Sequence, residues 1–199
     1  EAVPQPICGE VLVQPRNYGT LPGILLPLSH VLAEDPHATV IVMPTDHYIF
    51  PMHAFIRRAR RAMELVERYP DKLILLGAVP DSAVPDYGWV QCERTQEEGD
   101  EWTARPVTAF LEKPGARLAH DLYRRGWLWN TMMIVANVSV MWRTAYECAD
   151  DILHRFDMYR QVISAVRTGR APAHHRQLAL EQLYDNIEPA DFSRDLLQR

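Results

Sequence analysis

Short apolar runs alternate with helical periodicity along the first 140 or so residues. Five runs are predicted to be strands, at 10–15, 38–44, 72–80, 107–114 and 131–136. Several are continuous apolar stretches, which is typical of strands buried on both faces of a parallel sheet. Between the first three runs, apolar residues recur at helical spacing, at about 20–33 and at 52–68. This alternation predicts an α/β fold with a three-layer, open and mostly parallel sheet.

The boundaries of these elements carry further information. Pro22 suits the first turn of its helix, whereas Pro27 should kink that helix or mark a later start. The polar stretch 91–106 is predicted to be an exposed hairpin or loop. Beyond the last strand the pattern is mainly helical. We therefore expect residues 1–199 to form a single domain, with 137–199 as its mainly helical C-terminal part.

Composition excludes several classes of function. The formal net charge of −5 gives no reason to expect a nucleic acid or a membrane as partner. The run RRARR at 57–61 lies on the polar side of a predicted amphipathic helix and is interpreted as a solvated face. Three cysteines stand far apart and form no metal-binding pattern. With no signal peptide or long apolar span in view, a cytoplasmic protein is predicted.

The stretch ATVIVMPTDHYIF at 38–50 places a carboxylate and an imidazole where an apolar strand ends. Ligands of open parallel sheets bind beyond the carboxyl ends of the strands. A carboxylate on rigid framework there suits a divalent cation that bridges phosphates. Asp46 is therefore a candidate metal ligand. The alternative is that Asp46 caps the helix that follows, although the spacing is long for a direct cap.

The stretch FLEKP at 110–114 is a second candidate site. Its strand delivers Glu112 and Lys113 together before Pro114 ends it. Lysine suits a phosphate as a point charge, and glutamate can accept hydrogen bonds from hydroxyl groups. The alternative is a solvent-exposed ion pair at a strand end.

Three weaker signals surround these candidates. PDYGWVQ at 85–91 places a glycine where the backbone approaches another group closely. GWLWNTMM at 126–133 places Asn130 and Thr131 at the entrance of an apolar strand. QPRNYGTLPG at 14–23 opens a helix and could hold a base or a phosphate at its N-terminus.

Taken together and in this order, the stretches resemble the sugar-1-phosphate nucleotidyltransferases, and most closely the mannose-1-phosphate guanylyltransferases. The matching segments are PRNYGTLPGILLPL, VIVMPTDHYI, LGAVPDSAVPDYGWVQ, FLEKP and GWLWNTMMIV. They cover roughly residues 10 to 140. The resemblance implies the Rossmann-like nucleotide-diphospho-sugar transferase fold, incomplete at the N-terminus. It also implies synthesis of GDP-mannose and pyrophosphate from GTP and mannose-1-phosphate.

The resemblance implies roles on the nucleotide side of the site. Asp46 would be catalytic and would ligand Mg²⁺ or a similar divalent cation, with His47 in support. Asn17, Thr20 and Pro22 would lie near the guanine.

It also implies roles on the sugar-phosphate side. Lys113 would hold the sugar phosphate and count as catalytic. Tyr87 and Gly88 would lie against the mannose ring, and Glu112 would bind its hydroxyl groups. Asn130 and Thr131 would complete the sugar pocket.

Two family motifs do not occur in these 199 residues: the glycine-rich loop G-G-x-G-T-R-L-x-P-L and the downstream W-x-D-x-G segment. The expectation is therefore that this chain is part of an enzyme and has little activity alone. Better-known members also have W-N-S-G where this chain has WNTM at 129–132. Two alternatives stay open: a non-catalytic nucleotide-sugar-binding or regulatory homologue, and a nucleotidyltransferase for another sugar-1-phosphate. The sequence leaves the oligomeric state open, a homo-oligomer included.

Overall fold

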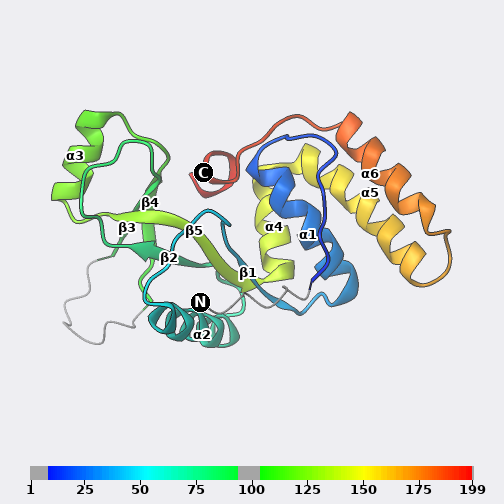
Figure 1. Ribbon diagram of the computed structural model, residues 1–199, viewed down its shortest axis with the longest axis horizontal. Coiled ribbons are helices and arrows are strands. Elements are labelled where there is room, and N and C mark those ends of the chain that lie inside the picture. Colours follow the sequence, from blue (N-terminus) through cyan, green and yellow to red (C-terminus); the bar gives the residue numbers. More distant parts are fainter. Residues whose placement is uncertain (1–8, 94–103, 199) are drawn as a thin grey trace, which may run out of the picture.

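The computed structural model describes residues 9–93 and 104–198. In chain order the elements are α1 (Thr20–Glu34), β1 (Thr39–Val42), α2 (Met52–Arg68), β2 (Ile74–Ala78), β3 (Trp89–Cys92), β4 (Val107–Leu111), α3 (Ala116–Arg124), β5 (Leu128–Asn137), α4 (Val138–Cys148), α5 (Asp150–Arg167), α6 (His174–Asp185) and the short π-helix η1 (Ser193–Leu197). Figure 1 shows β5 running from the end that carries α3 to the end that carries α1 and α4.

The long strand β5 organises the sheet. β1 pairs with it on one side, with Val42 opposite Ile134, and β2 pairs with it on the other side, with Ile74 opposite Val135. The amino-terminal part of β5 pairs with β3, which in turn pairs with β4. All four of these pairings are antiparallel.

The open α/β sheet is confirmed, but the prediction that its strands are mostly parallel is wrong for the described residues. β1 and β2 do run in the same direction and are joined by α2, as a crossover unit requires. They are not neighbours, however, because β5 lies between them and pairs with both. A strand that arrives late in the chain can separate two sequential strands, and local pattern carries no signal for that insertion.

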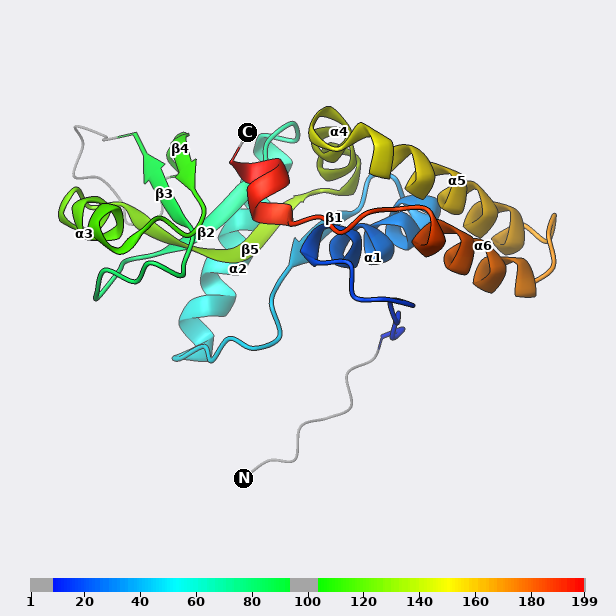
Figure 2. The same ribbon diagram turned by 90° about the horizontal axis from the view of Figure 1, so that it is seen from above.

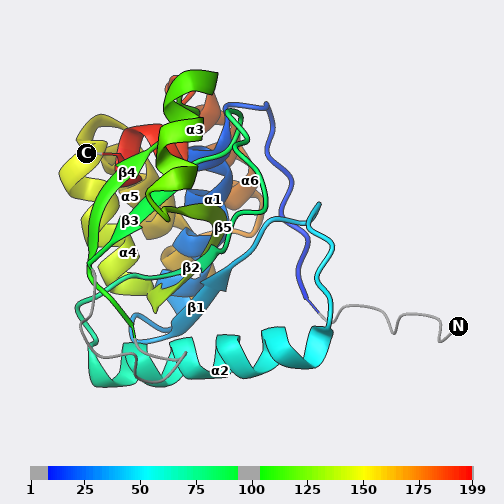
Figure 3. The ribbon, with the colours of Figure 1, turned by 90° about the vertical axis from the view of Figure 1, so that its left-hand side faces the viewer.

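Helices cover both faces of this sheet, as the three-layer prediction requires (Figure 3). Side chains alternate along β5, so that Ile134 and Ala136 face the larger helical layer and Val135 faces α2. Ala62 and Val66 of α2 pack on Val135. The alternation explains why the run at 131–136 is apolar at nearly every position.

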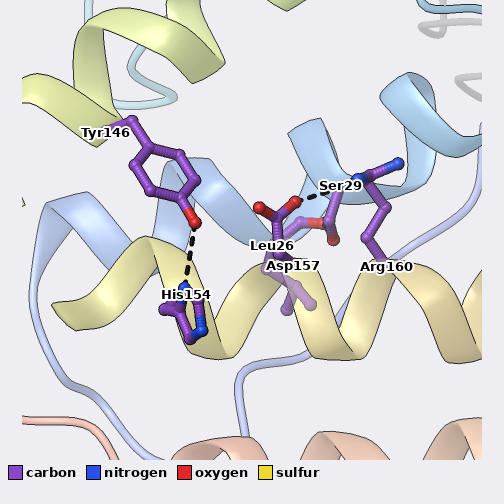
Figure 4. Close-up of polar contacts among 6 residues, drawn as sticks. All are labelled: Leu26, Ser29, Tyr146, His154, Asp157 and Arg160. Atoms are coloured by element: carbon purple, nitrogen blue, oxygen red, sulfur yellow. Dashed lines mark hydrogen bonds and ion pairs between the residues drawn. The ribbon is translucent and has the colours of Figure 1, made fainter. Parts of the chain in front are cut away.

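The larger helical layer consists of α1, α4, α5 and α6 (Figure 2). Several of its polar groups find partners within the layer (Figure 4). The Ser29 hydroxyl, which is fully buried, donates to the Leu26 carbonyl at 2.7 Å. On α5, Arg160 Nε donates to Asp157 at 3.0 Å, and His154 Nδ1 lies 3.1 Å from the Tyr146 hydroxyl.

Several predicted elements differ from the structure in type or extent. Residues 10–15 form no strand, and Val11 and Val13 are 85% and 72% exposed. A strand needs a hydrogen-bonded neighbour, and the described residues offer none to this segment. α1 begins at Thr20 and continues through Pro27, so Pro27 does not delay its start. Pro27 lies on the solvent side, while Leu25, Leu26 and Leu28 hold the helix to the core.

Two elements were not predicted at all. β3 is a four-residue strand whose Trp89 is fully buried, and α3 packs Ala119 and Leu122 against the same tryptophan. The predicted exposed hairpin or loop at 91–106 lies between β3 and β4, which pair antiparallel as in a hairpin, and its residues 94–103 lie outside the described residues. None of the helices in the described part of the chain combines the length and apolar character needed to cross a bilayer.

Candidate active site

A half-buried carboxylate stands at the centre of the candidate site. Glu112 follows directly after β4, and its Oε2 atom is buried and has no hydrogen-bond partner within the described residues. Gly88 lies so close that a Cβ atom added there would stand 2.7 Å from this oxygen and 3.1 Å from the Asn130 Cβ. Gly88, Glu112 and Asn130 therefore form one compact group; their contact with a sugar, which the resemblance implies, stays a prediction.

Backbone hydrogen bonds hold this group in place. Asn130 N donates to the Gly88 carbonyl at 2.8 Å, and Lys113 N donates to the Tyr87 carbonyl at 3.2 Å. The register of β3 with β4 and β5 brings these three segments together. Lys113 has a positive φ of 46°, which turns the chain sharply after β4.

The exposed side chains at this group are Tyr87 and Lys113. Tyr87 is 48% exposed, and its ring meets the Trp129 ring edge-on at 5.1 Å between centroids. Lys113 is exposed and forms no salt bridge with Glu112 within residues 9–93 and 104–198. The alternative of a solvent-exposed Glu112–Lys113 ion pair is therefore wrong. Neither side chain is therefore paired with the other.

Thr131 is directed elsewhere. Its hydroxyl donates to the Leu76 carbonyl of β2 and accepts from Met133 N at 3.3 Å. The neighbouring Met132 has a positive φ of 56°, and β2 carries a register irregularity at the same level. Thr131 thus lies at the register irregularity between β2 and β5, and its contact with a sugar stays a prediction.

Burial shifts the titration of Glu112. Loss of solvation raises the pKa of its carboxyl group above the ordinary value of 4.5, and the negative charge of Asp191 raises it further. The positive charges of Lys113 and Arg194 and the nearby Ser193 hydroxyl lower this pKa and so act in the opposite direction. A ligand that donates hydrogen bonds to Glu112 would stabilise its charged form.

We expect the pH dependence of stability to reveal this group. Because the pKa of Glu112 is higher in the folded state, the folded protein binds more protons between the unfolded and folded values. The free energy of unfolding should then fall as pH rises upward from about 4.5. In Glu112→Gln this fall should be reduced, as measured by the melting temperature across that pH window. The exposed Glu67→Gln is the control, and parallel profiles for wild type and Glu112→Gln would contradict the prediction.

The predicted nucleotide loop lies at the start of α1. The Asn17 Oδ1 atom accepts from Gly19 N at 3.2 Å, and both Asn17 and Thr20 are exposed. Pro22 is buried, and its carbonyl accepts from the Tyr184 hydroxyl at 3.5 Å. In this structure Pro22 supports the loop from within, and its proximity to a base stays a prediction.

Asp46 lies in the segment between β1 and α2. It follows β1 by four residues, is exposed, and has no hydrogen-bond or ion-pair partner for its carboxylate in the described part of the chain. α2 is preceded by Pro51 and has no side-chain cap, so the alternative that Asp46 caps this helix is wrong. The antiparallel register of Val42 with Ile134 directs the end of β1 toward the Asn130 end of β5. His47 is likewise exposed.

The donor set fits one mode of magnesium binding. The described residues contain no cluster of three or more acidic, histidine or cysteine side chains that could enclose a metal. Mg²⁺, however, is commonly held by one or two carboxylates together with substrate phosphates. A single unpartnered carboxylate close after a strand end is suited to that mode.

Sequence reasoning missed the residues of the C-terminal segment. Gln198 Oε1 accepts from Glu112 N at 3.1 Å, and Thr20 Oγ1 donates to Asp191 Oδ2 at 3.3 Å. This segment therefore touches both the Glu112 group and the nucleotide loop. The stretch YDNIEPADFSRDLL at 184–197 is also similar to a family segment, less specifically than the five stretches above, but that similarity assigns no contact to these residues.

A separate cavity of about 350 Å³ lies between residues 10–15, α1, α5 and α6. None of the predicted site residues lines it. Its polar groups are paired with one another: His30 Nε2 lies 3.1 Å from the Tyr159 hydroxyl, and Arg176 lies 3.3 Å from Glu10. The candidate site is thus distinct from this cavity.

Solved structures with a similar fold have been described. The chain superimposes on mannose-1-phosphate geranyltransferase from Thermus thermophilus with a TM-score of 0.74 and 19% identity, covering 94% of this chain and 49% of that one. It superimposes on mannose-6-phosphate isomerase from Helicobacter pylori with a TM-score of 0.69 and 18% identity, covering 93% of this chain and 66% of that one. These likenesses show the fold.

Sequence comparison agrees with the fold. A mannose-1-phosphate guanylyltransferase of Escherichia coli (strain K12) is 26% identical over 159 residues, which is 78% of this chain and 32% of that protein. The chain thus spans about a third of the length of this relative. The nucleotidyl transferase family pattern matches residues 5–169, and so confirms the resemblance seen in the motifs. The chain belongs to the nucleotidyl transferase family.

Proposed function

We propose that this chain carries the sugar-phosphate and nucleotide sites of a mannose-1-phosphate guanylyltransferase, which forms GDP-mannose and pyrophosphate. The observation that carries the proposal is Glu112. A half-buried carboxylate with one unpartnered oxygen, held against Gly88 and Asn130, is an acceptor for the adjacent hydroxyl groups of a sugar ring. The motif order and the guanylyltransferase relative support mannose and guanine as the specific choices.

Four further residues have roles in the proposed reaction. Lys113, next in sequence to Glu112, would hold the phosphate of mannose-1-phosphate. Tyr87 would cover the sugar ring, because its exposed ring stands beside this group. Asn17 and Thr20 would face the guanine.

The proposed reaction is an in-line displacement. An oxygen of the mannose-1-phosphate phosphate forms a bond to the α-phosphorus of GTP, and the bond to the bridging oxygen of the β-phosphate breaks to release pyrophosphate. Such chemistry depends on positioning and on charge neutralisation, with no covalent intermediate on the protein. Asp46 would hold Mg²⁺, which would supply positive charge to offset that of the phosphates.

Binding measurements test this proposal without requiring turnover. Calorimetric titration of the chain with mannose-1-phosphate should show binding. Glucose-1-phosphate should compete only poorly for the same site. Gly88→Ala should weaken this binding by about tenfold or more, since its Cβ would displace the Glu112 carboxylate and one charge-assisted hydrogen bond would be lost.

Gly115→Ala is the matched control, because a Cβ atom there meets nothing within 4 Å. Equal affinity for the two sugar phosphates would favour a nucleotidyltransferase for another sugar-1-phosphate. Absence of sugar-phosphate binding would refute the proposal. Binding of GDP-mannose, without pyrophosphate release even from a chain extended by its flanking coding sequence, would favour a non-catalytic homologue.

A further inference from the structure

Residues 190–198, here called the C-terminal clasp, make contacts with both halves of the candidate site. On the nucleotide side, Ala190 N donates to the Tyr18 carbonyl at 2.9 Å, and Leu21 N donates to the Ala190 carbonyl at 3.1 Å. The two backbone bonds enclose Gly19, whose φ of 90° admits the close approach of Ala190. The position of the nucleotide loop is thus fixed from the C-terminal end of the chain.

Asp191 adds side-chain contacts at the same point. Its Oδ2 atom accepts from the Thr20 hydroxyl at 3.3 Å, and that hydroxyl accepts from Phe192 N at 2.8 Å. Its Oδ1 atom accepts from Arg194 N at 3.0 Å. Phe192 is 2% exposed and anchors the clasp in the main core. Asp191 therefore links the first residue of α1 to the first turn of η1.

The other end of the clasp reaches the sugar-phosphate side. Ser193, which is 4% exposed, points its hydroxyl at Met132 Sδ at 2.9 Å. Gln198 Oε1 accepts from Glu112 N at 3.1 Å. In Figures 1 and 2, η1 lies between α4 and the end of the sheet formed by β3 and β4. A span of nine residues thus joins two groups that are far apart in sequence.

We propose that the C-terminal clasp couples the nucleotide loop to the Glu112 group, and that Asp191 is the positioning residue of this coupling. The coupling of the two segments rests on the unliganded structure. The further statement, that GTP and a sugar phosphate bind with positive cooperativity, rests on the proposed function. A ligand that fixes Glu112 orders Gln198 and η1, and through Asp191 it orders Thr20 before the second ligand arrives. The second ligand then meets part of its site already ordered.

Charge supports the same assignment. Asp191 is close enough to Glu112 for its negative charge to raise the pKa of that carboxyl group. The hydroxyl of Thr20 and the backbone amide of Arg194 together occupy both oxygens of Asp191. Asp191 is therefore held by donors of the protein itself. Its effect on a ligand is indirect, through the positions of Thr20 and Glu112.

The first experiment uses hydrogen–deuterium exchange on the unliganded chain. Asp191→Ala should raise the exchange rate of amides at 17–21 and at 112–113 together, by about fivefold or more, because both segments lose a shared support. Glu188→Gln, an exposed carboxylate change just before the clasp, should alter neither segment. Faster exchange at 17–21 with no change at 112–113 would overturn the coupling.

The second experiment measures the affinity for GTP with and without saturating mannose-1-phosphate. In the wild type we expect the sugar phosphate to tighten GTP binding about fivefold or more, a common size for such coupling. Asp191→Ala should reduce this ratio to about one, and Asp191→Asn should restore most of it because it keeps the acceptor for Arg194 N. If Asp191 has only a structural role, both variants should be less stable, but the ratio of GTP affinities with and without mannose-1-phosphate should stay as in the wild type. That result would overturn the proposal.

Gln198→Ala tests the clasp from its other, exposed end in case Asp191→Ala fails to fold. Gln198→Ala should raise the amide exchange rates at 112–113 and at 17–21 together. A rise confined to 112–113 would overturn the coupling. If the wild type binds neither ligand, the proposed function fails, while the exchange measurements still decide whether the clasp couples the two segments.

Discussion

Gly19→Ala is expected to lower the free energy of unfolding by about 2–3 kcal/mol, which corresponds to a fall of about 5–10 °C in melting temperature. Gly19 precedes α1 with a φ of 90° and a ψ of −171°, a backbone conformation that is essentially restricted to glycine. In addition, a Cβ atom there would stand 2.5 Å from the Ala190 carbonyl oxygen. Since that contact is with backbone, relief requires movement of the whole nucleotide loop or of the clasp.

Thermal or denaturant unfolding measures the effect. Gly115→Ala is the matched control, because Gly115 also precedes a helix, has a φ of −58°, and has no atom within 4 Å of an added Cβ. That variant should be within about 0.5 kcal/mol of wild type. Equal stability of Gly19→Ala and Gly115→Ala would show that the loop and the clasp do not hold each other as described.

Asp46→Ala is expected to remove most of the magnesium dependence of GTP binding. In the proposed function, the ion is held by one protein carboxylate and by the phosphates of the nucleotide. Without that carboxylate, the ion would no longer connect the nucleotide phosphates to the protein. The ratio of GTP affinities with and without magnesium should therefore fall by about 10–100-fold relative to wild type.

A fluorescent GTP analogue titrated with and without magnesium measures this ratio. Asp121→Asn serves as control, since Asp121 is an exposed carboxylate on α3. Asp46→Asn keeps an oxygen ligand and removes the charge, so it should lie between wild type and Asp46→Ala. If magnesium has the same effect on wild type and Asp46→Ala, the assignment of Asp46 as metal ligand is wrong.

The extent of agreement between sequence and structure differs among the elements. α2 was predicted over its full length, because its apolar residues repeat at helical spacing and Ala62 and Val66 are indeed buried. β3 was missed because it has four residues and little alternation, and it is stable only through pairing with β4 and β5. Short strands owe their existence to neighbours that local pattern does not reveal.

The same distinction applies to the site. Glu112 and Gly88 could be placed together from their motifs, and the structure brings them into contact. Thr131 was predicted beside them as well, but its hydroxyl is bound to the Leu76 carbonyl of β2. The pairing of β2 with β5 passes from Leu76–Met133 to Gly77–Asn130, so Thr131 lies in an irregularity of the pairing that local sequence does not reveal.

Residues of the C-terminal clasp were outside the reach of sequence reasoning. Asp191 is separated from Thr20 by 171 positions, and Gln198 from Glu112 by 86. Contacts of this kind depend on how the chain returns to the sheet after α4, α5 and α6. Neither composition nor periodicity specifies that path.

The sequence by itself determined the α/β character, the helices α1 and α2, the family, and the identity of the polar groups that stand where strands end. These features depend on local spacing and on motifs, so they are written in contiguous residues. Tertiary structure alone decided that β5 separates β1 from β2, that the Thr131 hydroxyl binds β2, and that residues 190–198 join the two halves of the candidate site. Those outcomes depend on long-range hydrogen bonds and shared burial, whose free energies arise only when distant segments pack together.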